Sequence, residues 1–189
     1  MRPKSITIIG AAGGGPIAIN EIFTDLPRLD SSFILIQQMP KYINESFCKN
    51  LNDLTPMLVK PAEDNEWMES GVIYVAPSEQ HITVQDNRKL MLSEGEKVHW
   101  VCPSVDVLMK SLKPDPQIKF ISVILTGLGQ DGAEGIVHMK SLNSTNIVQS
   151  KESCAIYGMP RCAMETNQVD FILDPDKIRL RLMSLLDLL

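Results

Sequence analysis

Two glycine-rich turns are the segments of this 189-residue sequence whose residue types could support chemistry. Residues 10–15 follow the short apolar run of residues 5–9, and residues 126–132 follow the apolar run of residues 120–125. In an open parallel sheet, ligands bind beyond the carboxyl ends of the strands, where the strand order reverses. A third unusual strand end, residues 37–40, is expected to frame the same crevice if the three strands are neighbours.

The first turn fits two chemical patterns, each imperfectly. Residues 13–18 have the G-x-G-x-x-A spacing of a dinucleotide loop, but Gln37 and Gln38 stand where an acidic residue would hold the ribose. The glycines also begin four residues beyond the expected strand end. Residues 10–14 (GAAGG) have the glycines of the G-x-S-x-G nucleophile turn, with Ala12 in place of the serine. A close-packed turn without chemistry remains a third interpretation.

Strand and helix patterns alternate at both ends of the chain, which predicts a parallel sheet covered on both faces. In the middle third, short runs at residues 72–76, 81–85 and 89–92 are separated by turn residues, which predicts an antiparallel insertion. The expected fold class is therefore α/β, a three-layer, doubly wound, mostly parallel sheet with an antiparallel β-hairpin insertion at its edge. Ser104 is expected to cap a helix. The last helix is expected to bury Ile178, Leu182, Leu185 and Leu189.

The composition is that of one globular domain spanning residues 1–189. Hydrophobic residues make up 44% and charged residues 22%, and the net charge of -5 is spread without a basic stripe, which argues against a nucleic-acid partner. We find no signal peptide and no apolar stretch long enough to cross a membrane, which favours a cytoplasmic protein without membrane insertion. The four cysteines lack CxxC spacing, so we expect reduced thiols, no metal and no cofactor.

Further segments match, in order, the motifs of one known family. They are residues 9–15 (IGAAGGG), 37–40 (QQMP), 76–81 (APSEQH), 103–108 (PSVDVL), 125–133 (LTGLGQDGA) and 153–161 (SCAIYGMPR). Together they resemble the catalytic domain of the CheB-type protein-glutamate methylesterases over nearly the whole chain. The resemblance implies a cytoplasmic chemotaxis enzyme that hydrolyses methyl esters on receptor glutamates and, in some members, deamidates receptor glutamines. Many members carry an N-terminal receiver domain, and we expect none within residues 1–189.

The resemblance also implies where a Ser-His-Asp triad would lie. The family serine aligns with Ala12, the histidine with Gln38 and the aspartate with Asp131, which is retained. Alanine has no oxygen to attack an ester carbonyl, and an amide has no useful basicity near neutral pH. Asp131 is alternatively a cap of the helix that begins there. The residues expected to contact substrate are Gly13, Gly14, His81, Leu128 and Met159.

Three functional hypotheses follow. The first is a pseudoenzyme that binds the cytoplasmic helices of chemotaxis receptors or other chemotaxis proteins. The second is an atypical hydrolase of the same family, in which His81 or Asp131 activates a water. The third is a phosphate or small-molecule-binding module that uses the amides of the two glycine-rich turns. The leucine-rich C-terminal end is expected either to cap the sheet or to form part of a dimer face.

Overall fold

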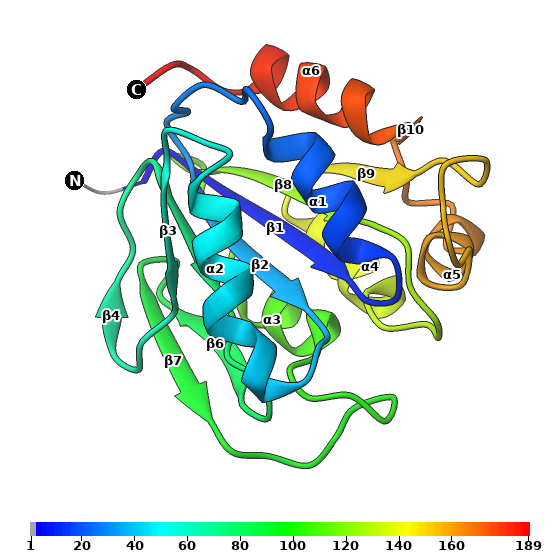
Figure 1. Ribbon diagram of the computed structural model, residues 1–189, viewed down its shortest axis with the longest axis horizontal. Coiled ribbons are helices and arrows are strands. Elements are labelled where there is room, and N and C mark those ends of the chain that lie inside the picture. The colour runs from blue at the N-terminus through cyan, green and yellow to red at the C-terminus, as the bar shows by residue number, and fades with distance from the viewer. Residues whose placement is uncertain (1–2) are drawn as a thin grey trace.

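The computed structural model describes residues 3–189 and is built around a seven-stranded sheet of order β10-β9-β8-β1-β2-β5-β3 (Figure 1). All neighbouring strands in this sheet run parallel. The chain builds outward from β1 in one direction and later returns to its other side with β8, so the strand order reverses between them. The strands are β1 (Ser5–Ala11), β2 (Ser32–Gln37), β3 (Leu58–Pro61), β5 (Val72–Val75), β8 (Lys119–Ile124), β9 (Thr145–Gln149) and β10 (Phe171–Leu173).

Helices cover both faces of the sheet, as the alternating sequence pattern predicts (Figure 1). The helices α1 (Gly15–Phe23), α2 (Asn44–Asn52) and α6 (Pro175–Leu185) pack on one face, and α2 follows a short 3-10 turn, Lys41–Ile43. The helices α3 (Val105–Ser111), α4 (Ala133–Ser141) and α5 (Met159–Glu165) pack on the other. Neighbouring residues of β1 point to opposite faces, so Ile8 joins one hydrophobic core and Ile9 the other. The predicted three-layer α/β class is confirmed.

A second, three-stranded antiparallel sheet of order β4-β7-β6 forms the predicted insertion. It consists of β4 (Glu66–Trp67), β6 (His81–Gln85) and β7 (Lys89–Ser93). Our assignment of residues 72–76 to this insertion is wrong, because β5 pairs in parallel with β2 and β3 in the main sheet. All four residues of β5 are buried, which is the pattern of a parallel strand covered on both faces.

Two element boundaries also differ from expectation. Strand β1 continues to Ala11, two residues further than predicted, so the first glycine-rich turn begins directly at the strand end. Helix α6 ends at Leu185, and Leu189 lies outside it, with its backbone N–H donating to the carbonyl of Arg28. Leu188 forms an isolated antiparallel bridge with Leu29, so the C-terminal segment lies beside the loop that precedes β2. The expected cap is confirmed, since Ser104 Oγ accepts a hydrogen bond from Val107 N at 3.3 Å.

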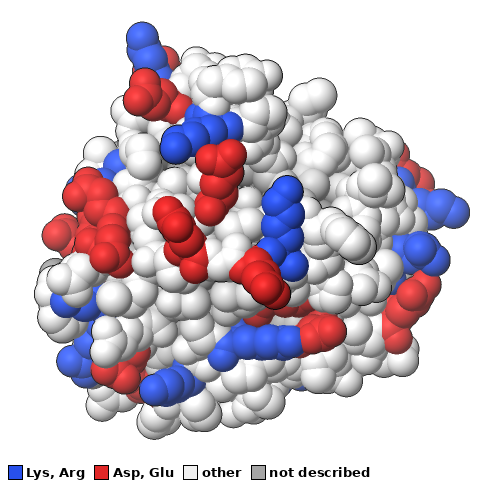
Figure 2. Space-filling view, turned by 90° about the horizontal axis from the view of Figure 1, so that it is seen from below, with Lys and Arg blue, Asp and Glu red and all other residues white. Residues whose placement is uncertain are grey.

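On the face shown in Figure 2 the basic side chains do not gather into one large patch, and acidic side chains lie among them. A nucleic-acid groove needs clustered Lys and Arg, and this face offers none. Across the part of the chain that the structure describes, residues 3–189, every helix is too short or too polar to cross a bilayer.

Candidate active site

Three strand ends meet at the reversal of strand order, as the sequence predicts. The backbone N–H of Ala12, just after β1, donates to the carbonyl of Thr126 at the end of β8. On the other side, the N–H of Gln38 donates to the carbonyl of Ala11. The segments 10–15, 37–40 and 126–132 therefore form one crevice at the carboxyl edge of the sheet.

The first glycine-rich turn is held closely against β2. Gly14 has a φ of 81°, and a side chain at Gly15 would begin 2.0 Å from Gln37 Oε1. The amide of Gln37 donates to the carbonyl of Ala12 at 2.9 Å and to that of Gln38 at 3.0 Å. The buried side chain of Gln37 therefore holds the backbone of both Ala12 and Gln38, where the family resemblance places the nucleophile and the base.

Ala12 faces the second glycine-rich turn. It is half-buried, and a Cβ built on Gly127 would lie 2.9 Å from the Ala12 Cβ and 2.3 Å from Met159 Sδ. Met159 is fully buried beneath this contact, whereas Leu128 is 75% exposed at the rim. Of the residues expected to contact substrate, Gly13, Gly14, Leu128 and Met159 therefore surround Ala12, with Gly13 and Leu128 on the outside.

Gln38 is hydrogen-bonded to Asp131. The family resemblance implies this pairing, because it places the base of the triad at Gln38 and the acid at Asp131. Gln38 Nε2 donates to Asp131 Oδ2 at 2.9 Å. The Asp131 carboxylate is 2% exposed and accepts three further hydrogen bonds, from Ser104 Oγ, Val105 N and Asp106 N, at 2.7 to 3.0 Å. Asp131 thus caps the N-terminus of α3. Our alternative assignment, a cap of the helix that follows Asp131, names the wrong helix.

His81 lies outside the crevice. It opens β6, it is 5% exposed, and its Nε2 lies 2.9 Å from the carbonyl oxygen of Glu96. Its Nδ1 accepts a hydrogen bond from Ser104 N at 3.3 Å, which assigns the ring proton to Nε2. Both ring nitrogens are therefore engaged by backbone groups, and His81 supports the start of α3 rather than a reacting group.

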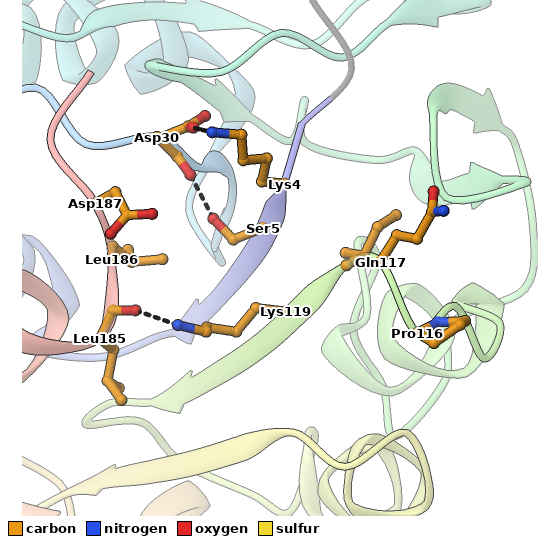
Figure 3. Close-up of a pocket in the computed structure, with 10 residues that line it drawn as sticks. Lys4, Ser5, Asp30, Pro116, Gln117, Lys119, Leu185, Leu186 and Asp187 are labelled. Carbon is orange, nitrogen blue, oxygen red and sulfur yellow. Dashed lines mark hydrogen bonds and ion pairs between the residues drawn. The ribbon is translucent and has the colours of Figure 1, made fainter.

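Ser5, at the start of β1, and Ser31, just before β2, also lie away from Ala12. Ser5 begins β1 and lines a cavity of about 290 Å³ at the opposite edge of the sheet (Figure 3). Its hydroxyl donates to the carbonyl of Asp30 at 2.6 Å, and Lys4 and Lys119 close the cavity with their own polar partners. The hydroxyls of Ser31 and Thr7 lie 2.9 Å apart. Neither serine replaces the missing nucleophile.

Comparison with known proteins decides the family. The model of the CheB methylesterase family matches residues 7–182. The chain belongs to the CheB methylesterase family. Curated relatives include a protein-glutamate methylesterase/protein-glutamine glutaminase of Sulfurimonas denitrificans, 36% identical over 97% of this chain and 53% of the relative. A protein with the same name from Pyrococcus horikoshii is 34% identical over 93% of this chain and 49% of its own length.

A solved structure agrees with this membership. The CheB methylesterase catalytic domain of Thermotoga maritima superposes with a TM-score of 0.89 at 32% identity, covering 95% of this chain and 97% of that one. The chain spans about half the length of the curated relatives that it matches. The match therefore extends over the CheB catalytic domain.

Asp106 and His99, which the sequence analysis did not predict as site residues, lie beside the crevice. Asp106 is 1% exposed on the first turn of α3, and its Oδ1 accepts a hydrogen bond from Gly135 N of α4 at 2.6 Å. Burial, followed by the nearby charge of Asp131, raises the pKa of Asp106 above its ordinary value, although the bond from Gly135 opposes this. His99 Nε2 lies 3.3 Å from Asp106 Oδ2. A lone histidine in a loop gives no sequence signal for this pairing.

The described residues give no support for a metal centre. Within residues 3–189 no group of three or more His, Cys, Asp or Glu side chains converges at ligand distances. The thiols are poorly suited to ligation as well, because burial raises the pKa of Cys48 and of Cys154 to about 11.

Proposed function

We propose that this chain is a CheB-family domain that binds chemotaxis proteins without the serine mechanism of the family. The hydrogen bond from Gln38 Nε2 to Asp131 Oδ2 carries this proposal. The side-chain amide of Gln38 stands where the resemblance implies an imidazole. Its N–H group already donates to the carboxylate of Asp131. The amide oxygen that remains has too little basicity to take a proton from a hydroxyl group.

The nucleophile position supports the same reading. Ala12 presents a methyl group to Gly127 and cannot form an acyl-enzyme. In a serine protease, removal of the serine or the histidine lowers turnover about 10⁶-fold, and roughly 10³–10⁴ over water remains from binding and the oxyanion hole. The fold around Ala12 is therefore expected to bind without turning over a methyl ester at a rate useful to the cell.

The rim of the crevice offers apolar contacts for a partner. Leu128 is 75% exposed on the second glycine-rich turn, and Trp100 is 91% exposed on the neighbouring loop. Large exposed apolar side chains are typical of interaction surfaces when they lie beside a cleft. The proposed partners are cytoplasmic helices of chemotaxis receptors or other chemotaxis proteins, which places the domain in the cytoplasm.

The two other hypotheses have less support. A water activated by His81 needs a free ring nitrogen, and both are engaged; Asp131 already accepts four hydrogen bonds. A phosphate site at the glycine-rich turns needs free amides. The N–H of Gly15 donates to the carbonyl of Ala12, and that of Gly127 to the carbonyl of Ile156.

The test is methanol release from methylated receptor membranes, combined with co-sedimentation of the protein with those membranes. We expect co-sedimentation without methanol release for the native sequence and for the single variants Ala12→Ser and Gln38→His. The double variant Ala12→Ser/Gln38→His is expected to gain activity, because Gln37 and Asp131 already hold both positions. Turnover by the native chain at the rate of active family members, or failure to sediment with receptors or other chemotaxis proteins, contradicts the proposal.

A further inference from the structure

A tight turn beside the crevice holds two large side chains in an unfavourable backbone conformation. Residues 98–101 are closed by two hydrogen bonds between Val98 and Val101, each 3.0 Å long. Between them His99 has a φ of 51° and Trp100 a φ of 69°. Two successive left-handed residues are typical of Asn-Gly turns, and a histidine or tryptophan there is strained. Such strain persists where a surrounding contact requires the conformation, and here His99 contacts Asp106.

The His99 ring is held in place by a buried carboxylate. Its Nε2 lies 3.3 Å from Asp106 Oδ2, and Asp106 is itself fixed by Gly135 N. Gln130 Nε2 lies 2.9 Å from His99 Nδ1. An amide nitrogen can only donate, so His99 Nδ1 accepts this hydrogen bond and carries the lone pair of the ring. Gln130 is exposed, so solvent or a ligand can replace its amide.

His99 and Gln130 both line a cavity of about 440 Å³, and Ala12 is not among its lining residues. The volume is in the range of small-molecule sites. Trp100 and Leu128 give this cavity apolar walls, and Arg161 supplies a cation. The partner of Arg161 is Glu165 at 3.3 Å, with both side chains more than half exposed, so this ion pair yields readily to a carboxylate ligand.

Charged groups from three helices surround the His99 ring. Asp106 and Lys110 come from α3, Glu134 from α4 and Arg161 from α5. Glu134 Oε1 lies 3.9 Å from His99 Nε2 and is ion-paired with Lys110. These charges largely compensate one another, which leaves the buried Asp106 carboxylate as the group that orients the imidazole.

We propose that His99, oriented by Asp106, is a general base that hydrolyses small aryl esters bearing a carboxylate in this cavity. Nδ1 takes a proton from a water molecule as the water oxygen bonds to the ester carbonyl carbon. The tetrahedral intermediate then breaks its bond to the leaving oxygen, which receives the proton from the imidazolium, and the products are an acid and a phenol. Arg161 binds the substrate carboxylate, and Trp100 packs on the aromatic ring.

The experiment follows hydrolysis of 4-carboxyphenyl acetate, with phenyl acetate as the uncharged comparison. The key variant is His99→Asn, because asparagine tolerates left-handed backbone and keeps the turn folded. The matched control is His138→Gln, since His138 lies on α4 and contacts the carbonyl of Leu112. We expect His99→Asn to lower the rate at least about 10-fold, as general bases contribute about 10²–10⁴-fold, and His138→Gln to leave it unchanged.

A further readout separates this mechanism from unspecific surface hydrolysis. Arg161→Gln is expected to raise KM for 4-carboxyphenyl acetate without changing the rate with phenyl acetate. A native rate equal to that of buffer, or a His99→Asn rate equal to the native one in a folded variant, overturns the proposal. Ala12 and Gln38 take no part in this reaction, so its outcome is independent of whether the native chain releases methanol from methylated receptors.

Discussion

Gln38 Nε2 donates a 2.9 Å hydrogen bond to Asp131 Oδ2, a carboxylate that is 2% exposed and that also caps helix α3. A buried carboxylate needs donors whether or not it takes part in catalysis. Glutamine at this position supplies a donor to Asp131 and no base. The pair therefore explains how the position can lose its proton acceptor while the local structure is retained.

Gln38→Ala is expected to lower the free energy of unfolding by about 1–2 kcal/mol, because it removes one of the four hydrogen bonds that the buried Asp131 carboxylate accepts. Urea denaturation followed by circular dichroism measures the change. Gln85→Ala is the matched control, since Gln85 is an exposed glutamine on β6, and we expect it to change stability by less than about 0.5 kcal/mol. Equal effects of the two variants contradict a structural role for Gln38.

Asp131→Asn is expected to destabilise the fold by about 2–4 kcal/mol. Asp131 accepts from Gln38 Nε2, Ser104 Oγ, Val105 N and Asp106 N, and an amide group turns one acceptor oxygen into a donor that faces these donors. Asp53→Asn, at the exposed end of α2, makes the same chemical change without such partners. A midpoint shift in urea that is no larger for Asp131→Asn than for Asp53→Asn disproves the capping role.

The architecture was predictable because its signals are local. The alternation of strand and helix patterns at both ends of the chain predicted the parallel sheet and the helices on both of its faces. Residues 72–76 were misplaced because a short apolar run gives no information about its pairing partner. Leu189 fits the helical spacing of α6, but the helix ends at Leu185 and the chain pairs with the loop around Leu29. Tertiary contacts decided both cases.

Gly127→Ala is expected to destabilise the domain by about 1–3 kcal/mol, whereas Gly13→Ala changes stability by less than about 1 kcal/mol. The new methyl group at Gly127 meets both Met159 Sδ and the Ala12 Cβ in a packed region. At Gly13 it meets Ile156 Cδ1, the end of a side chain that is 38% exposed and can move aside. Thermal denaturation of the two variants tests this order, and the reverse order contradicts the packing described here.

The candidate site was predictable only in part, for a related reason. Motif spacing identified Ala12, Gln38 and Asp131, which the fold brings to one crevice. His81 was expected there because it follows a strand, but it opens β6 and its ring is turned toward Ser104. The pairing of His99 with Asp106 depends on a left-handed turn at His99 and Trp100, a conformation that residues other than glycine seldom adopt. Sequence propensities therefore point away from that turn.

Asp106→Asn is expected to gain stability relative to the native chain as the pH rises from about 4 to 7. Burial raises the pKa of Asp106, so the folded protein holds its proton more tightly than the unfolded chain does. The contribution of Asp106 is thus most favourable in acid and is lost as the pH rises through the raised pKa. Asparagine keeps the acceptor for Gly135 N and does not titrate.

Urea denaturation of both proteins at several pH values measures this difference. His99 Nε2 lies 3.3 Å from Asp106 Oδ2, so the comparison is repeated in a His99→Asn background. We expect the same direction of change there, because burial is the largest cause of the raised pKa. If the difference in free energy of unfolding between the two proteins stays constant with pH, or if Asp106→Asn loses stability relative to the native chain as the pH rises, the ionised carboxyl group of Asp106 is not destabilised by its burial.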